Sequence, residues 1–181
     1  MSGLIGSVRN VKIFVLYLME NINYPLDFVT INDIVMQTDY VMYLDFAEAF
    51  TEMLDGELIL GVEDGGETLY VVTEKGKMVA RELKSDLLPS ILDRSLSAAL
   101  RYLNFKKRGI TAKCTVEPTE DGRFAVICLF TENKVEIFSQ TVVVDTKDRA
   151  ERMKTNFYER PEAIYRGVLA LLAGNVNYLF D

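Results

Sequence analysis

The sequence predicts an α+β fold built from two parts, and three observations support this. In the first half of the chain, apolar residues recur at helical spacing and then give way to two strand-like runs around glycines. One long helical pattern follows at 89–105. The second half shows three strand-like runs and then two helical patterns, the order of a small α+β unit. We expect a first domain at 1–88, a connecting helix at 89–108 and a second domain at 109–181.

Three helices are expected at the start of the chain. Residues 8–22 are so rich in Ile, Val, Leu, Phe and Tyr that this helix should be buried on most of its circumference. Thr30 and Asp33 fit the pattern of a hydroxyl N-cap followed by an acid three residues later, which predicts a second helix starting at Thr30. The third helix is expected at 44–55.

A hairpin and a fourth helix complete the first part. Strands are predicted at 58–62 and 68–72, separated by the glycine-containing turn 63–67, and a helix should begin at Thr73 or Glu74. The order of three helices, a hairpin and a helix is that of a winged helix-turn-helix. The second and third helices would form the turn pair, and the hairpin would form the wing.

The second part should be a three-stranded antiparallel sheet with two helices. Its strands are expected at 111–117, 123–131 and 135–144, and its helices at 147–158 and 161–173. The apolar residues of the last helix and of 176–180 are assigned to the core, and their low polarity on all sides also permits an oligomer interface. Cys114 and Cys128 should lie opposite each other on adjacent strands, as two reduced core thiols or, alternatively, as a cross-strand disulfide.

Several classes of function are excluded by composition. The 181 residues include no His and only two Cys, so a Ser-His-Asp or Cys-His triad and a zinc cluster are impossible. No phosphate-binding glycine motif is present, and we expect a non-enzymatic protein with no cofactor and no metal. The longest apolar run, 13–19, is too short to span a membrane, and the first residues show no signal-peptide pattern, so a cytoplasmic location is expected.

Charge is distributed unevenly along the chain. The formal net charge is −7, from 27 acids and 20 bases. Yet no Lys or Arg occurs between Ile13 and Glu74, where thirteen of the acids lie, whereas 94–116 contains bases and no acid. Such asymmetry bears on the partners that each part can bind.

The predicted third helix carries a stripe of four acids opposite its apolar face. At 100° per residue, this acidic stripe consists of Asp45, Glu48, Glu52 and Asp55. A DNA-reading helix needs Lys and Arg for the phosphates, so DNA contact through this helix is not expected. The stripe is either a solvated helix face or a binding surface for a basic partner protein or a second copy of the chain. Its like-charge pairs each cost about 0.2–0.5 kcal/mol with no Lys to offset them, so helix stability alone does not favour them.

A basic stretch follows on the long helix and just after it. It consists of Arg94, Arg101, Lys106, Lys107 and Arg108. Three interpretations remain open for it: a solvated surface, a site for nucleic acid or another anion, or a surface that neutralises the acidic stripe in a charge-matched homodimer.

Two sequence resemblances bear on function. The segments Phe50-Thr-Glu-Met-Leu-Asp-Gly-Glu-Leu-Ile59 and Tyr70-Val-Val-Thr-Glu-Lys-Gly-Lys77 resemble winged-helix transcriptional regulators, in which a Thr-x-x-Gly pattern begins the helix after the wing. The whole chain, with Ser95-Leu-Ser-Ala-Ala-Leu-Arg-Tyr-Leu-Asn104, also looks like an uncharacterised family of bacterial proteins of about this length.

The first resemblance implies a transcriptional regulator whose third helix enters the major groove, and the acidic stripe departs from that pattern. We therefore expect either a regulator that contacts DNA through the basic stretch, or a winged helix that binds a basic protein partner through the acidic stripe. In both cases a homodimer is expected.

Overall fold

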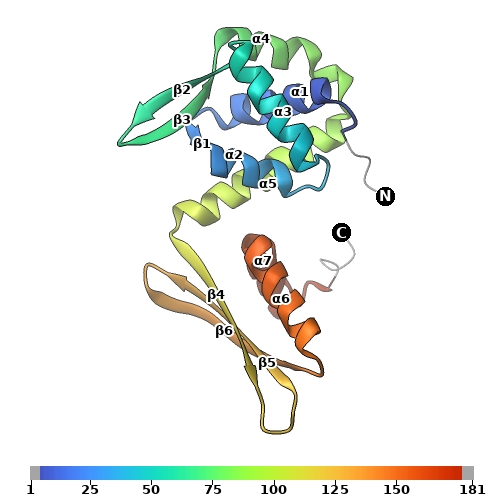
Figure 1. Ribbon diagram of the computed structural model, residues 1–181, viewed down its shortest axis with the longest axis vertical. Coiled ribbons are helices and arrows are strands. Elements are labelled where there is room, and N and C mark those ends of the chain that lie inside the picture. Colours follow the sequence, from blue (N-terminus) through green and yellow to red (C-terminus); the bar gives the residue numbers. More distant parts are fainter. Residues whose placement is uncertain (1–4, 177–181) are drawn as a thin grey trace. The chain divides into compact units, whose positions relative to one another are not determined.

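The computed structural model describes residues 5–176 and has an α+β architecture (Figure 1). The described residues form seven α-helices and two three-stranded antiparallel sheets, in the strand orders β1-β3-β2 and β4-β5-β6. They divide into two compact units, and the division falls between Tyr102 and Leu103, inside the long helix α5.

The predicted helices and strands are all present, with ends that differ by a few residues. The first unit contains α1 (Val8–Ile22), β1 (Leu26–Asp27), α2 (Phe28–Met36), α3 (Tyr43–Asp55), β2 (Ile59–Asp64), β3 (Glu67–Val72) and α4 (Glu74–Leu83). A 3₁₀ turn, η1 (Lys84–Asp86), leads to α5 (Pro89–Lys107). The second unit contains β4 (Ile110–Pro118), β5 (Phe124–Glu132), β6 (Val135–Val144), α6 (Lys147–Glu159) and α7 (Pro161–Leu172).

Helix α1 is a core helix of the first unit. Its buried residues include four in succession, from Ile13 to Leu16, which cannot all lie on one stripe of a helix. The side chain of Ser7 caps the helix by accepting the backbone N–H of Asn10, and Asn23 ends it in the left-handed conformation. The prediction that this helix is buried on most of its circumference is confirmed.

Helix α2 begins before Thr30, and the prediction that it starts there is wrong. Its N-cap is Asp27, whose carboxylate accepts the backbone N–H of Thr30 at 2.8 Å and the hydroxyl of Thr30 at 2.5 Å. Thr30 therefore lies in the first turn and is buried. Asp and Thr are both good N-caps, and here the Asp three residues upstream forms the cap. The unpredicted strand β1, with Leu26 opposite Tyr70, precedes it and is too short to show an alternating pattern.

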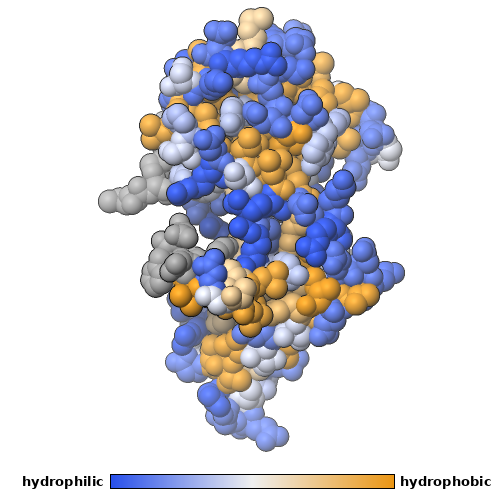
Figure 2. Space-filling model, turned by 180° about the vertical axis from the view of Figure 1, so that it is seen from behind, coloured by the Kyte–Doolittle hydropathy of each residue, from blue (hydrophilic) through white to orange (hydrophobic). Residues whose placement is uncertain are grey.

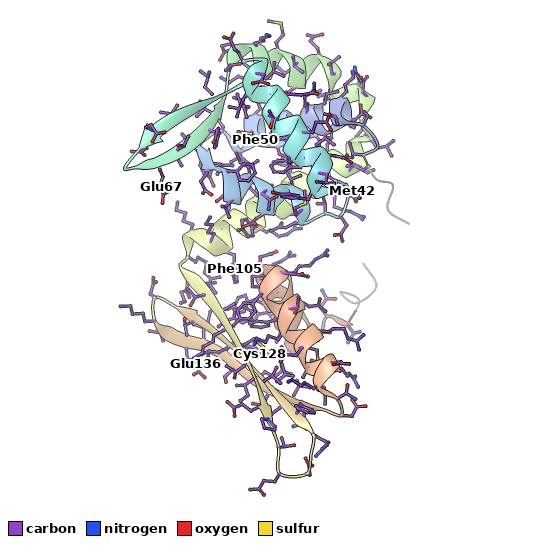
Figure 3. The ribbon with its side chains drawn as sticks, in the orientation of Figure 1. Met42, Phe50, Glu67, Phe105, Cys128 and Glu136 are labelled. Carbon is purple, nitrogen blue, oxygen red and sulfur yellow. The ribbon has the colours of Figure 1, made fainter. Side chains whose placement is uncertain are left out.

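The apolar face of α3 packs inside the first unit. Phe46 and Phe50 are buried, and with Phe28 and Tyr70 they form an aromatic cluster whose neighbouring ring centroids lie 4.9 to 5.8 Å apart. Figure 3 shows Phe50 within this unit. Because this cluster holds one face of α3 inward, the opposite face is left to solvent.

The hairpin of β2 and β3 has a tighter turn than predicted. Asp64 pairs with Glu67, which leaves a turn of two residues, Gly65 and Gly66. Their φ angles of 59° and 89° lie in the region that glycine adopts without strain, as a two-residue hairpin turn requires.

Helix α4 begins at the Thr-x-x-Gly pattern. The structure shows why this pattern has Thr at position 73 and Gly at position 76. The hydroxyl of Thr73 accepts the backbone N–H of Gly76 at 3.0 Å and donates to the carbonyl of Glu57 at 2.8 Å. Gly76 is buried against the backbone of Leu58, so close that a Cβ on residue 76 would lie 2.1 Å from the Leu58 carbonyl oxygen. The pattern therefore combines a helix cap with a close approach of two backbone segments.

In the second unit, the helices that follow the sheet pack on one of its faces (Figure 1). Phe130 of β5 is fully buried at the centre of this core. Four other aromatic rings have centroids within 4.8 to 6.1 Å of its own: Phe105, Phe138, Phe157 and Tyr165. The opposite face of the sheet, formed by the alternate residues of each strand, lies away from this core.

The last helix is more exposed than predicted. Ile164 of α7 packs at the edge of the core, but Leu169, Leu171 and Leu172 are 47%, 39% and 76% exposed. The assignment of these three leucines to the core is therefore wrong, since only one side of α7 meets the core. Val176 is also exposed, and the remaining predicted core positions, 177–180, lie outside the described residues.

Candidate interaction surfaces

The acidic stripe lies on α3 opposite the aromatic cluster. Glu48, Glu52 and Asp55 are exposed and Asp45 is partly buried, so their placement on the outer face is as the helical spacing predicts. The hairpin adds acids near its tip, where Glu67 is placed in Figure 3. Within residues 43–72, which include α3 and the hairpin, there is no Lys or Arg.

One member of the acidic stripe has a partner within the same unit. The ammonium group of Lys12 on α1 lies 2.5 Å from a carboxylate oxygen of Glu52. The expectation that no Lys offsets the like-charge repulsion of the stripe is therefore wrong. The spacing along α3 could not show this pair, because its two residues are forty positions apart in the chain.

Three exposed apolar side chains at the start of α3 were not predicted as functional residues. Met42, Tyr43 and Leu44 are 56%, 55% and 74% exposed, and Figure 3 labels Met42 beside the start of the helix. At 100° per residue, Leu44 falls directly next to the acidic stripe. That position on the helix is the signal in the sequence that could have identified Leu44. Exposed apolar residues with charged residues next to them on the same helix are common in protein–protein interfaces, which have an apolar centre and a polar rim.

Other exposed apolar residues are scattered. Figure 2 shows them interspersed with hydrophilic residues over the face it presents, as on most protein surfaces. The run at 42–44 differs because its three members are consecutive, and because Leu44 adjoins a charged stripe of one sign.

The residues of the basic stretch belong to different units. Arg94 and Arg101 of α5 are exposed, as predicted, and lie in the first unit. Lys106, Lys107 and Arg108 are exposed and lie in the second. Arg108 forms two hydrogen bonds to the carboxylate of Glu132, at 2.8 and 3.1 Å. The hydrogen bonds to this carboxylate raise the pKa of Arg108, so its guanidinium stays charged and is paired within its own unit.

An open polar cavity of about 660 Å³ lies between the end of α1 and α4. Glu20 and Arg81, which line it, form an ion pair at 2.6 Å, and Lys77 pairs with Glu74 at the same distance. These charges are satisfied by each other, and the lining contains no nucleophile next to a base.

Among residues 5–176, no three His, Cys, Asp or Glu side chains are grouped so that they could hold a metal ion. No described helix combines the length and apolarity needed to cross a membrane.

The two cysteines lie opposite each other in neighbouring strands, as predicted. Cys114 of β4 pairs in register with Cys128 of β5, and both are free thiols with sulfur atoms 3.6 Å apart. Both side chains face the apolar core under α6. Desolvation by burial, together with the neighbouring thiol, raises the pKa of Cys128 to about 12.

This environment predicts slow thiol chemistry in the folded protein. With a pKa of about 12, roughly one Cys128 in ten thousand is a thiolate near pH 8, against about a quarter of ordinary thiols. We expect a disulfide reagent such as DTNB to react with the native chain at least about 100-fold more slowly than with the chain in denaturant. Cys114→Ser and Cys128→Ser variants assign the reacting thiol. Complete reaction of both thiols in the native chain within seconds would contradict this prediction.

Comparison with known proteins assigns the family. A family model described as a domain of unknown function (DUF4364) matches residues 11–172, which includes both units. No curated protein and no solved structure matches the chain. The expected membership of an uncharacterised family is confirmed at this level. Since the match extends over most of its length, the chain belongs to the DUF4364 family.

Proposed function

We propose that this protein is a non-enzymatic winged-helix protein that recognises a basic protein partner through α3. The arrangement of the first unit supports the winged-helix part of the proposal. Its elements run α1, β1, α2, α3, β2, β3, α4, and the short strand β1 adds to the hairpin through β3. In this arrangement α2 and α3 are the turn pair, and the hairpin is the wing.

The surface of α3 is the observation that carries the proposed function. A DNA-binding winged helix would present this helix to a row of phosphates, and here it presents carboxylates. A protein partner fits this surface better, because Met42, Tyr43 and Leu44 supply exposed apolar area at the start of the same helix, with Leu44 next to the charges. Desolvated apolar contacts provide affinity, and the surrounding charges select the sign of the partner.

The charge of the partner follows from those carboxylates of the acidic stripe that form no ion pair within the described residues. Glu52 is paired with Lys12, whereas Asp45, Glu48 and Asp55 form no ion pair with any residue in the described range 5–176. A complementary partner segment therefore carries an apolar anchor flanked by Lys or Arg, as on one face of a basic amphipathic helix.

The DNA-binding alternative is less well supported. It depends on the basic stretch, in which Arg108 is already held by both oxygens of Glu132. Arg94 and Arg101 are the residues on which a regulator that contacts DNA through α5 would depend. The two proposals therefore differ in which residues their ligands need.

The two proposals are separated by one titration with two labelled probes. The first probe is a basic amphipathic peptide with Leu and Lys at helical spacing, and the second is a random-sequence DNA duplex. We expect the full chain to bind the peptide, and a triple variant with Asp45→Asn, Glu48→Gln and Asp55→Asn to bind it at least about tenfold more weakly in fluorescence anisotropy.

A matched control removes the same charge from the hairpin. A variant with Glu63→Gln, Asp64→Asn and Glu67→Gln has the same net charge as the α3 triple variant and should keep most of the affinity. Equal losses in the two variants would show a mere net-charge effect and contradict the proposal. Binding of the duplex that is abolished by Arg94→Ala with Arg101→Ala would support the DNA-contacting regulator instead.

A further inference from the structure

The sheet of the second unit has two edge strands, β4 and β6, because β5 lies between them. The middle of β4 is blocked by Tyr158 of α6. The hydroxyl of Tyr158 accepts the backbone N–H of Cys114 at 2.8 Å and donates to the carbonyl of the same residue at 3.2 Å. An edge strand whose outward backbone groups are already bonded cannot pair with another strand at that point.

The same contact shows which backbone groups of β6 point outward. Because the N–H and C=O of Cys114 point away from β5, the opposite residue Cys128 directs its own groups toward β6, where it faces Gln140. These directions alternate along a strand. The outward groups of β6 are therefore those of Ser139, Thr141 and Val143. None of the three makes a backbone hydrogen bond to a loop or turn within the described chain.

The part of strand β6 from Phe138 to Val144 lacks the features that protect an edge, and the register shift of β6 lies before it, between Glu136 and Phe138. Between Phe138 and Val144 there is no charged residue, no proline and no glycine, and the last four residues are β-branched. On the face that meets the helices, Phe138 and Val142 are only partly buried, at the margin of the core. A strand of this composition with free backbone groups is a template for pairing.

We propose that β6 pairs in antiparallel fashion with β6 of a second copy of this chain, so that two three-stranded sheets become one sheet of six strands. With the two-fold axis at Thr141, Ser139 of each copy pairs with Val143 of the other. The outward groups of all three residues then have partners. Phe138 of one copy lies beside Val144 of the other, which continues the apolar core across the junction.

Charge favours the antiparallel direction over the parallel one. A parallel pair would set Glu136, near the start of β6 (Figure 3), beside Glu136 of the other copy. In the antiparallel pair, Glu136 lies instead at the end of the other strand, where Lys147 begins α6. Since the paired stretch itself is uncharged, added salt should leave this dimer intact. A dimer that joins the acidic stripe to the basic stretch would dissociate in salt.

Hydrogen exchange resolved by residue tests the pairing in the full chain. We expect the amides of Ser139, Thr141 and Val143 to be protected at concentrations where sedimentation shows a dimer. Their protection factors should fall at least about tenfold on dilution to monomer. The amides of Gln140 and Val142 point toward β5 and should stay protected in both states.

A pair of variants provides the second test. Thr141→Lys places two ammonium groups at the two-fold axis and should weaken the dimer at least about tenfold. Thr111→Lys is the matched control, because Thr111 is exposed on the same sheet face but on β4, and it should leave the dimer constant within about twofold. Circular dichroism checks that both variants fold.

Three outcomes would overturn the proposal. The first is a chain that stays monomeric at the highest concentration reached. The second is a dimer in which the three outward amides exchange as fast as in the monomer. The third is a folded Thr141→Lys variant that dimerises like the wild type.

Discussion

Gly76→Ala is expected to lower the free energy of unfolding of the first unit by about 2–4 kcal/mol. The added Cβ would lie 2.1 Å from the carbonyl oxygen of Leu58 and 2.8 Å from a methyl group of Val72. Leu58 cannot simply move aside, because its carbonyl also accepts the backbone N–H of Thr73 at 3.0 Å. The better helix propensity of Ala, about 1 kcal/mol, does not offset this clash.

Urea unfolding followed by circular dichroism measures the effect of this substitution. Gly61→Ala is the matched control, since its Cβ would meet side chains and no backbone, a methyl group of Thr68 at 3.1 Å and the ring of Tyr70 at 3.6 Å, on an exposed strand. We expect the control to remain within about 1 kcal/mol of the wild type. A Gly76→Ala chain as stable as Gly61→Ala would show that α4 and the hairpin do not approach as closely as described.

Phe130→Ala is expected to destabilise the second unit by about 3–5 kcal/mol. The ring is fully buried, and four other aromatic rings surround it. Truncation would leave a cavity bounded by large planar side chains, which do not collapse readily into the space. The loss of stability therefore includes both the transfer free energy of the buried ring and the free energy cost of the cavity that it leaves.

The neighbouring residue provides the control for this prediction. Leu129→Ala removes an apolar side chain of the same strand on the opposite, more accessible face of the sheet, so we expect a loss of about 1 kcal/mol. The difference between the free energies of unfolding of the two variants, measured in urea, shows how strongly the core is confined to the helix-covered face of the sheet. Equal losses would contradict a core that lies on the helix-covered face alone.

The secondary structure was predicted well where a strong local pattern exists. The Thr-x-x-Gly pattern placed the start of α4, and the periodicity of α3 placed its acidic stripe outward, since both depend on residues within one or two turns. The start of α2 was missed because two residues three apart are both good caps. Strand β1 was missed because its two residues are defined only by their pairing with β3.

The interaction surfaces were predicted less completely, for a different reason. A helical wheel separates the inward face of α3 from the outward face, but it does not show how far the start of the helix protrudes. The exposure of Met42, Tyr43 and Leu44 depends on the direction in which the segment between α2 and α3 enters the helix. Phe28 of α2 packs against Phe46 and Phe50 of α3, and such contacts between helices cannot be seen on a helical wheel of α3 alone.

The sequence by itself determined the order of elements, the register that brings Cys114 opposite Cys128, and the absence of positive charge from α3 and the hairpin. These properties follow from local periodicity, turn residues and composition. Only the tertiary structure decided that Lys12 neutralises Glu52, that Glu132 holds Arg108, and that Tyr158 blocks one sheet edge and not the other. Each of these contacts joins residues 24 to 44 positions apart, and such contacts depend on how elements pack and not on the pattern within any one of them.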